Sequence, residues 1–134
     1  MPIVEFSQDD INRSVIVEPA WYRVTINGIN QRPSKDAGST NYFVEGRIIC
    51  NAENGDKKFE GVPTPNNWLF NSKAMSNMVG FVAALTGEKP APGQGYRIES
   101  AVGKEIEVFI ENGLYNNQVQ NQIHHKYRSA KASV

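Results

Sequence analysis

The chain has 134 residues, 40% of them apolar, which supplies one hydrophobic core and favours a single domain over residues 1–134. Its 14 basic and 14 acidic side chains cancel, which argues against a strongly basic protein dedicated to polyanions. The only cysteine, Cys50, excludes an internal disulfide, so we expect a cytoplasmic protein.

The most apolar stretch lies around residues 75–85, far short of the roughly 20 residues that span a bilayer. The N-terminal sequence MPIVEFSQDD lacks a basic region that leads into an apolar one. We therefore expect no membrane association and no signal peptide. About 17 N-terminal and about six C-terminal residues are expected to be peripheral.

Charge is distributed unevenly along the chain. Residues 1–18 carry four acids and one base, and residues 59–111 carry six acids and four bases. By contrast, residues 19–58 carry six bases and four acids, and residues 112–134 carry three bases and no acid. A locally basic surface is therefore compatible with zero net charge.

Alternating apolar residues predict two long strands in the first half of the chain. Residues 20–30 place Tyr22 and its alternate neighbours on one face, with Gly28 marking a bulge. The following RPSKDAGST has the composition of an exposed loop. Residues 41–50 alternate again, with Val44 and Ile48 on one face.

The second half of the chain predicts three further strands and one helix. The Asn54-Gly55 turn leads into a third strand at KKFEGV, residues 57–62. A helix is expected over residues 73–86, with a buried stripe formed by Met75, Met78, Val79, Val82 and Leu85. Residues 104–111 and 119–128 alternate and predict the last two strands.

The predicted fold is mainly β: a five-stranded OB-fold-like barrel with one helix between strands 3 and 4. The OB-fold is a partly open Greek-key barrel that has this order of elements. A different α+β meander would give the same order, so the assignment depends on element order alone.

Sequence motifs of catalysis are absent. The chain contains no GxxxxGK[ST], GxGxxG, HExxH, GxSxG or paired CxxC. Adjacent strand residues point to opposite faces, so His124 and His125 do not easily share a metal ion with Cys50. Glu105, Glu107 and Glu111 are spaced as on an ordinary solvated strand face. We therefore expect no enzyme, no metal site and no cofactor.

Aromatic and basic residues alternate on the polar faces of the first two strands. Single-stranded nucleic acid is held by a basic groove and by aromatic rings on which bases stack. Trp21 with Arg23, and Phe43 with Arg47, show this pattern on consecutive strands. The alternative for Trp21 and Phe43 is a structural role, and the reverse strand register would bury both.

Loops and strand ends supply further candidate contacts. In an OB-fold, the ligand face is built on strands 2 and 3 and bordered by the loops that join strands 1 to 2 and 4 to 5. Basic side chains suited to phosphates, together with one loop aromatic, complete the predicted site: Arg32, Lys35, Lys57, Lys58, Lys126 and Tyr115.

Three segments together resemble a known family. They are PAWYRVTINGINQRPSKDAGSTNYFVEGRI, KAMSNMVGFVAALTG and GKEIEVFIENGLYNNQVQNQI, within about residues 18–128. In this order they resemble small phage proteins, long catalogued as an uncharacterised domain and grouped with phage OB-fold single-stranded DNA-binding proteins. The resemblance implies sequence-independent coating of single-stranded DNA during phage DNA replication or recombination, in the host cytoplasm.

The C-terminus departs from that family. Many of its members end in an acidic tail that recruits other replication proteins, whereas this chain ends in basic and small residues. Recruitment of replication or recombination proteins by such a tail is therefore in doubt, and a monomer or weak homo-oligomer is expected. The alternative function is a protein-protein interaction module, a phage factor that docks on a host or replication protein through the same aromatics.

Overall fold

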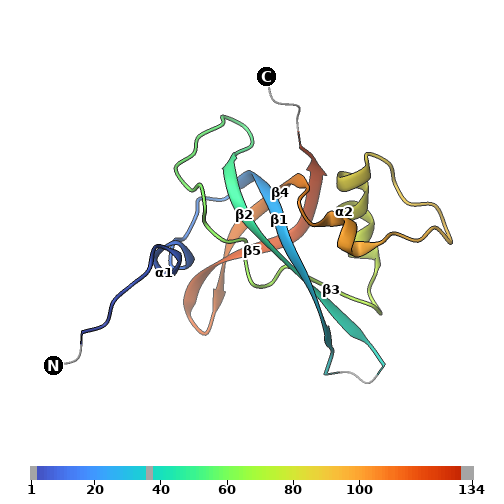
Figure 1. The fold of residues 1–134 in the computed structure, drawn as a ribbon, viewed down its shortest axis with the longest axis horizontal. Coiled ribbons are helices and arrows are strands. Elements are labelled where there is room, and N and C mark those ends of the chain that lie inside the picture. The colour runs from blue at the N-terminus through green and yellow to red at the C-terminus, as the bar shows by residue number, and fades with distance from the viewer. Residues whose placement is uncertain (1–2, 36–37, 131–134) are drawn as a thin grey trace.

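The structure is a computed structural model that describes residues 3–35 and 38–130, without the side chains of Asp9, Arg13, Tyr115 and His124. Within these described residues, five strands, two α-helices and a short 3-10 helix follow one another (Figure 1). Their order is α1 (Gln8–Arg13), β1 (Ala20–Pro33), β2 (Thr40–Asn51), β3 (Leu69–Asn71), α2 (Ser76–Thr86), η1 (Ile98–Ala101), β4 (Glu105–Tyr115) and β5 (Gln118–Ser129).

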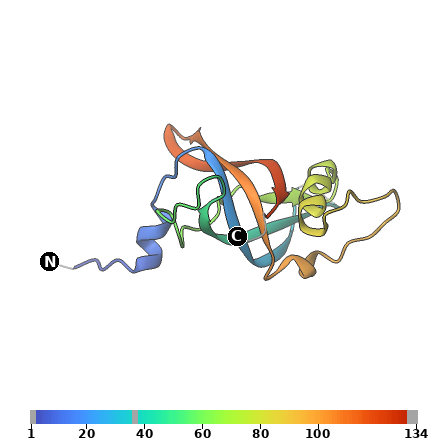
Figure 2. The ribbon, with the colours of Figure 1, turned by 90° about the horizontal axis from the view of Figure 1, so that it is seen from above.

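The strands form one antiparallel sheet in the order β3-β2-β1-β4-β5. The long β1 lies at its centre and pairs with both β2 and β4. The predicted mainly β class is confirmed. The predicted barrel is wrong: β3 and β5 remain the two edges, and the sheet is not closed. Figure 2 shows the twisted sheet between α1 at one end and α2 at the other.

The third strand lies elsewhere than predicted. Residues 58–61 form turns, and β3 is the short segment Leu69–Asn71, which pairs with the start of β2. The Asn51 side chain accepts hydrogen bonds from the amides of Glu53 and Asn54, so this loop closes locally instead of starting a ladder. Asn51, at the end of β2, exchanges backbone hydrogen bonds with Gly55 and Asp56, and pairing with the inner part of β2 resumes at Gly61, whose amide donates to the Ile48 carbonyl.

Alternation in β1 and β2 follows the prediction. Tyr22, Val24 and Ile26 are buried, as are Val44 and Ile48 on the neighbouring strand. The register between the strands shifts between Ile26 and Gly28, so the predicted bulge is confirmed. The opposite face of both strands therefore carries the predicted aromatic and basic side chains.

The helices differ in part from the prediction. A short helix, α1, lies in the N-terminal segment and begins with a capping box between Ser7 and Asp10. Helix α2 begins at Ser76, three residues later than predicted, and ends as predicted at Gly87 in the left-handed conformation. Met75 precedes the helix and is exposed. The buried helical residues are Met78, Phe81, Val82 and Ala84.

An aromatic cluster fills the core between α2, β3 and β5. The rings of Trp68 and Tyr127 stack with centroids 6.1 Å apart, and Phe81 meets Tyr127 edge-on at 5.4 Å. Val17, predicted to be peripheral, is also buried. Within the described ranges, no helix is both long and apolar enough to cross a membrane.

Two asparagine amides act as substitutes for backbone pairing. The Asn67 side chain donates to the Ile123 carbonyl at 3.0 Å and accepts from the Ile123 amide at 3.1 Å. The Asn121 side chain likewise donates to the Val15 carbonyl and accepts from the Val17 amide, both at 2.9 Å. These bonds attach the segment before β3, and the segment after α1, to β5.

Alkaline pH should destabilise the fold through Tyr127. Burial raises the pKa of this phenol above its ordinary value, so the fold favours the neutral form. The resulting stability is fully present below the ordinary tyrosine pKa of about 10 and falls as the pH rises above it. Between about pH 8 and about pH 11, Tyr127→Phe should lose about 1 kcal/mol less unfolding free energy than the parent.

Urea unfolding followed by circular dichroism at the two pH values measures this difference. Burial also raises the pKa of Tyr22, so Tyr127→Phe should keep part of the alkaline loss. An equal loss in the parent and in Tyr127→Phe would contradict the assignment.

Candidate nucleic-acid interface

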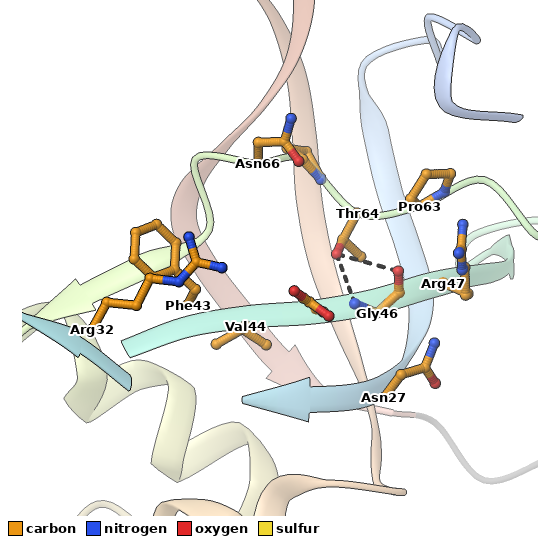
Figure 3. A pocket seen from close by; sticks show the side chains of 11 residues that line it. Asn27, Arg32, Phe43, Val44, Gly46, Arg47, Pro63, Thr64 and Asn66 are labelled. Carbon is orange, nitrogen blue, oxygen red and sulfur yellow. Dashed lines mark hydrogen bonds between the residues drawn. The ribbon is translucent and has the colours of Figure 1, made fainter. Parts of the chain in front are cut away.

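A cleft of about 380 Å³ lies between the outer face of β2 and the segment that leads to β3 (Figure 3). We call it the β2 cleft. Its lining combines two arginines, one aromatic ring, one carboxylate and several small or polar groups: Asn27, Arg32, Phe43, Val44, Glu45, Gly46, Arg47, Pro63, Thr64, Pro65 and Asn66. The lining therefore carries one more positive than negative charge.

Strand alternation explains why Phe43 and Arg47 share this face. Val44 and Ile48 are buried in the core, so the residues that precede them point outward. Arg32 reaches the same face from the end of β1, where it pairs with Asn41 of β2. Its guanidinium carbon lies 5.3 Å from the Phe43 ring centroid, within cation–π distance.

The opposite wall is fixed by a close backbone approach. The Gly46 amide donates to Thr64 Oγ1 at 3.0 Å, and this hydroxyl lies 3.4 Å from the Gly46 carbonyl (Figure 3). A Cβ at position 46 would lie 2.5 Å from the Thr25 carbonyl oxygen. Glycine at this position therefore lets β1, β2 and the Thr64 segment meet.

The two arginines of the β2 cleft are positioned differently. Arg47 is half-buried, and its Nη1 donates to the Gly61 carbonyl at 3.5 Å. Asn12 of α1 donates to the same carbonyl at 3.4 Å, so α1 adjoins this end of the cleft. Arg32 is exposed at the other end. Glu45, between them, accepts a hydrogen bond from Asn30 at 2.8 Å.

A second cleft of about 220 Å³ continues from the first. The two share Pro63, Thr64, Pro65 and Asn66. The second cleft extends to β5 and is lined there by Gln120 and Asn121, with Asn67 nearby. Because four of its described lining side chains are amides and none of them is charged, we call it the amide cleft.

Trp21 and Arg23 lie on a different patch, formed by β1, β4 and β5. The Arg128 guanidinium lies 4.2 Å from the Trp21 ring centroid, and Phe109 meets the same ring edge-on at 5.7 Å. Arg128 also forms ion pairs with Glu107 and Glu53. We call this patch the Trp21 face.

The charges of the Trp21 face are largely paired. Arg23 Nε donates to Glu105 at 2.7 Å, and Lys126 Nζ lies 3.9 Å from Glu111 and 5.2 Å from the Phe109 ring centroid. Four carboxylates therefore accompany three bases here. The predicted pair Trp21 and Arg23 is outward-facing, but neither residue lines the β2 cleft with Phe43 and Arg47.

The remaining predicted contacts are scattered. Lys57 and Lys58 lie in the loop after β2 instead of in a strand, and Lys58 is 3.5 Å from Glu18. Lys35 is exposed in the loop between β1 and β2. Tyr115 ends β4 beside the β4–β5 turn, and its side chain lies outside the described part of the chain.

The segment Pro63–Asn67 was not among the predicted site residues, although it forms a wall of both clefts. It follows directly after the third strand predicted over residues 57–62 and contains two prolines, Pro63 and Pro65. Prolines interrupt a strand ladder, so the segment that contains them lies beside the sheet without regular pairing. These prolines were the sequence signal from which a cleft wall at this segment could have been predicted. Within residues 3–35 and 38–130, no three His, Cys, Asp or Glu side chains are grouped to hold a metal ion.

No protein-family model matches the sequence, and a search of curated proteins finds no similar sequence. The interpretation of the site therefore depends on its own geometry and chemistry.

Proposed function

We propose that the protein binds single-stranded DNA in the β2 cleft, without catalysis of its own, in phage DNA replication or recombination. The observation that carries this proposal is the group formed by Arg32, Phe43 and Arg47. It combines a ring beneath a guanidinium with a second arginine on the same open strand face. Stacking on the ring and charge contact with phosphates are the two interactions that hold single strands regardless of sequence.

Single strands fit this group better than a duplex. A ring on a strand face can stack only with a base whose own face is free, which paired bases in a duplex do not offer. The small excess of positive charge predicts modest affinity that falls with salt concentration.

We further propose that the fold is an opened OB-fold. The order β3-β2-β1-β4-β5, with α2 between β3 and β4, is compatible with an OB barrel whose first and last sheet positions have separated. The β2 cleft then occupies the face on which OB-folds bind oligonucleotides, beside the loop between β1 and β2.

A protein-interaction module is the second candidate, favoured by the N-terminal segment. Ile3, Val4 and Phe6 are 86%, 71% and 72% exposed. Figure 1 shows this segment extending away from the sheet. Exposed apolar side chains of this kind are typical of surfaces that contact another protein.

A fluorescence titration distinguishes the two functions. Labelled oligothymidine of about 30 nucleotides is titrated at low and moderate salt, with a duplex of equal length as control. Salt-sensitive binding to the single strand and weak binding to the duplex are expected. Absence of binding to both would overturn the proposed function and favour the protein-interaction module, whose apolar contacts depend little on salt.

A further inference from the structure

The amide cleft contains two kinds of amide. Asn67 and Asn121 each make two hydrogen bonds to backbone groups, so both of their polar atoms are occupied. These bonds connect the Pro63–Asn67 segment to β5, and β5 to the segment after α1. The walls of the cleft are therefore fixed before any ligand arrives.

The other two amides are available. Asn66 and Gln120 are exposed, and neither side chain makes a hydrogen bond within the part of the chain that the structure describes. An amide presents a donor and an acceptor side by side. Figure 3 shows Asn66 above the β2 strand, at the boundary shared by the two clefts.

The chemistry of the amide cleft suits a nucleobase rather than a phosphate. Among the residues that the structure describes, its lining has no cation for a phosphate, whereas an unpaired base exposes donors and acceptors along its edges. Asparagine and glutamine amides form two simultaneous hydrogen bonds with adenine, through its N6 and N7 atoms.

We propose that Asn66 and Gln120 bind the edge of an unpaired adenine in the amide cleft. The neighbouring nucleotides of the same strand lie on Phe43 and between the arginines of the β2 cleft. This inference rests on the proposed function and deepens it. Stacking and phosphate contacts supply affinity for any sequence, and the amide cleft adds a preference for strands that contain adenine.

The test compares oligothymidine with the same oligomer carrying single adenines at regular intervals. Adenines are placed singly because oligoadenine stacks on itself. The parent should bind the adenine-containing strand about three- to tenfold more tightly. In the double variant Asn66→Ala/Gln120→Ala this preference should disappear. In Gln120→Ala alone, which changes a residue of the amide cleft that does not line the β2 cleft, the preference should shrink while plain oligothymidine affinity stays within about twofold and keeps its salt dependence.

Gln118→Ala is the matched control, because Gln118 is an exposed amide of the same strand outside both clefts. It should keep the adenine preference. The inference is overturned if the parent shows no preference, or if the double variant retains it. Failure of the parent to bind plain oligothymidine would instead overturn the proposed function, so the two failures are distinguishable.

Discussion

Replacing Phe43 and Arg47 together with alanine is expected to weaken binding of single-stranded DNA at least about tenfold, since one stacked base contributes roughly 1–3 kcal/mol. Arg47→Ala alone should also lower the slope of log affinity against log salt by about 1, because one phosphate contact is lost. Fluorescence titration with oligothymidine at several salt concentrations measures both effects. Circular dichroism checks that the variants are folded.

Matched substitutions on other surfaces separate this site from the Trp21 face. Phe109→Ala removes an aromatic ring from the Trp21 face, and Arg97→Ala removes an exposed arginine that lines neither cleft. Both should leave affinity within about twofold, as expected of residues outside an interface. If Phe109→Ala weakens binding while the Phe43 and Arg47 variants do not, the interface lies on the Trp21 face.

The largest expected loss of stability follows from Arg128→Met. Arg128 forms ion pairs with Glu53 and with Glu107, whose side chain is only 2% exposed. Removing one partner of a buried ion pair typically costs about 3–5 kcal/mol. Arg128 itself is 33% exposed, so we expect about 3 kcal/mol, measured by urea unfolding with circular dichroism as the signal.

A second substitution tests the cause of that loss. Glu107→Leu/Arg128→Met replaces both charges with apolar groups and should recover most of the lost stability. Lys58→Met, which removes a pair between two exposed side chains, should cost below about 1 kcal/mol. If the double variant is as unstable as Arg128→Met, the stacking of Arg128 on Trp21 is the main contribution instead.

Local side-chain patterns predicted the long strands well. In a strand, successive side chains point to opposite faces, so the alternation over residues 20–26 and 42–48 predicts which of them face the core. This depends only on residues that are neighbours in the sequence. Gly28 at the bulge and Gly87 at the helix end were predictable for the same reason, since each is a local backbone requirement.

Features that depend on distant segments could not be predicted. Two prolines prevent a regular third strand, so β3 forms from only three residues, Leu69–Asn71, which form no recognisable alternation. Closure of the barrel depends on whether this short strand pairs with β5. The distance between these two strands cannot be predicted from a local sequence pattern. The predicted barrel was therefore wrong, although the predicted order of strands and helix is also that of an OB barrel.

The candidate site shows the same limit. Alternation places Trp21 and Phe43 outward, yet it does not determine what covers each ring. Arg128, more than 100 residues after Trp21 in the sequence, stacks on that ring and brings two carboxylates with it. Phe43 instead lies beneath Arg32, from the neighbouring strand. This long-range charge pairing cannot be inferred from the sequence. It distinguishes the Trp21 face, whose charges are largely paired, from the group formed by Arg32, Phe43 and Arg47.

The asparagine pairing at Ile123 has a further consequence for how the molecule behaves in a crowded solution. An open sheet offers free backbone groups at its edges, onto which strands of other chains can add. The Asn67 amide already occupies the outward N–H and C=O of Ile123, in the middle of the β5 edge. One side chain thus interrupts the row of free backbone groups along β5 to which a strand of another chain would have to pair. It thereby protects the open sheet from aggregation.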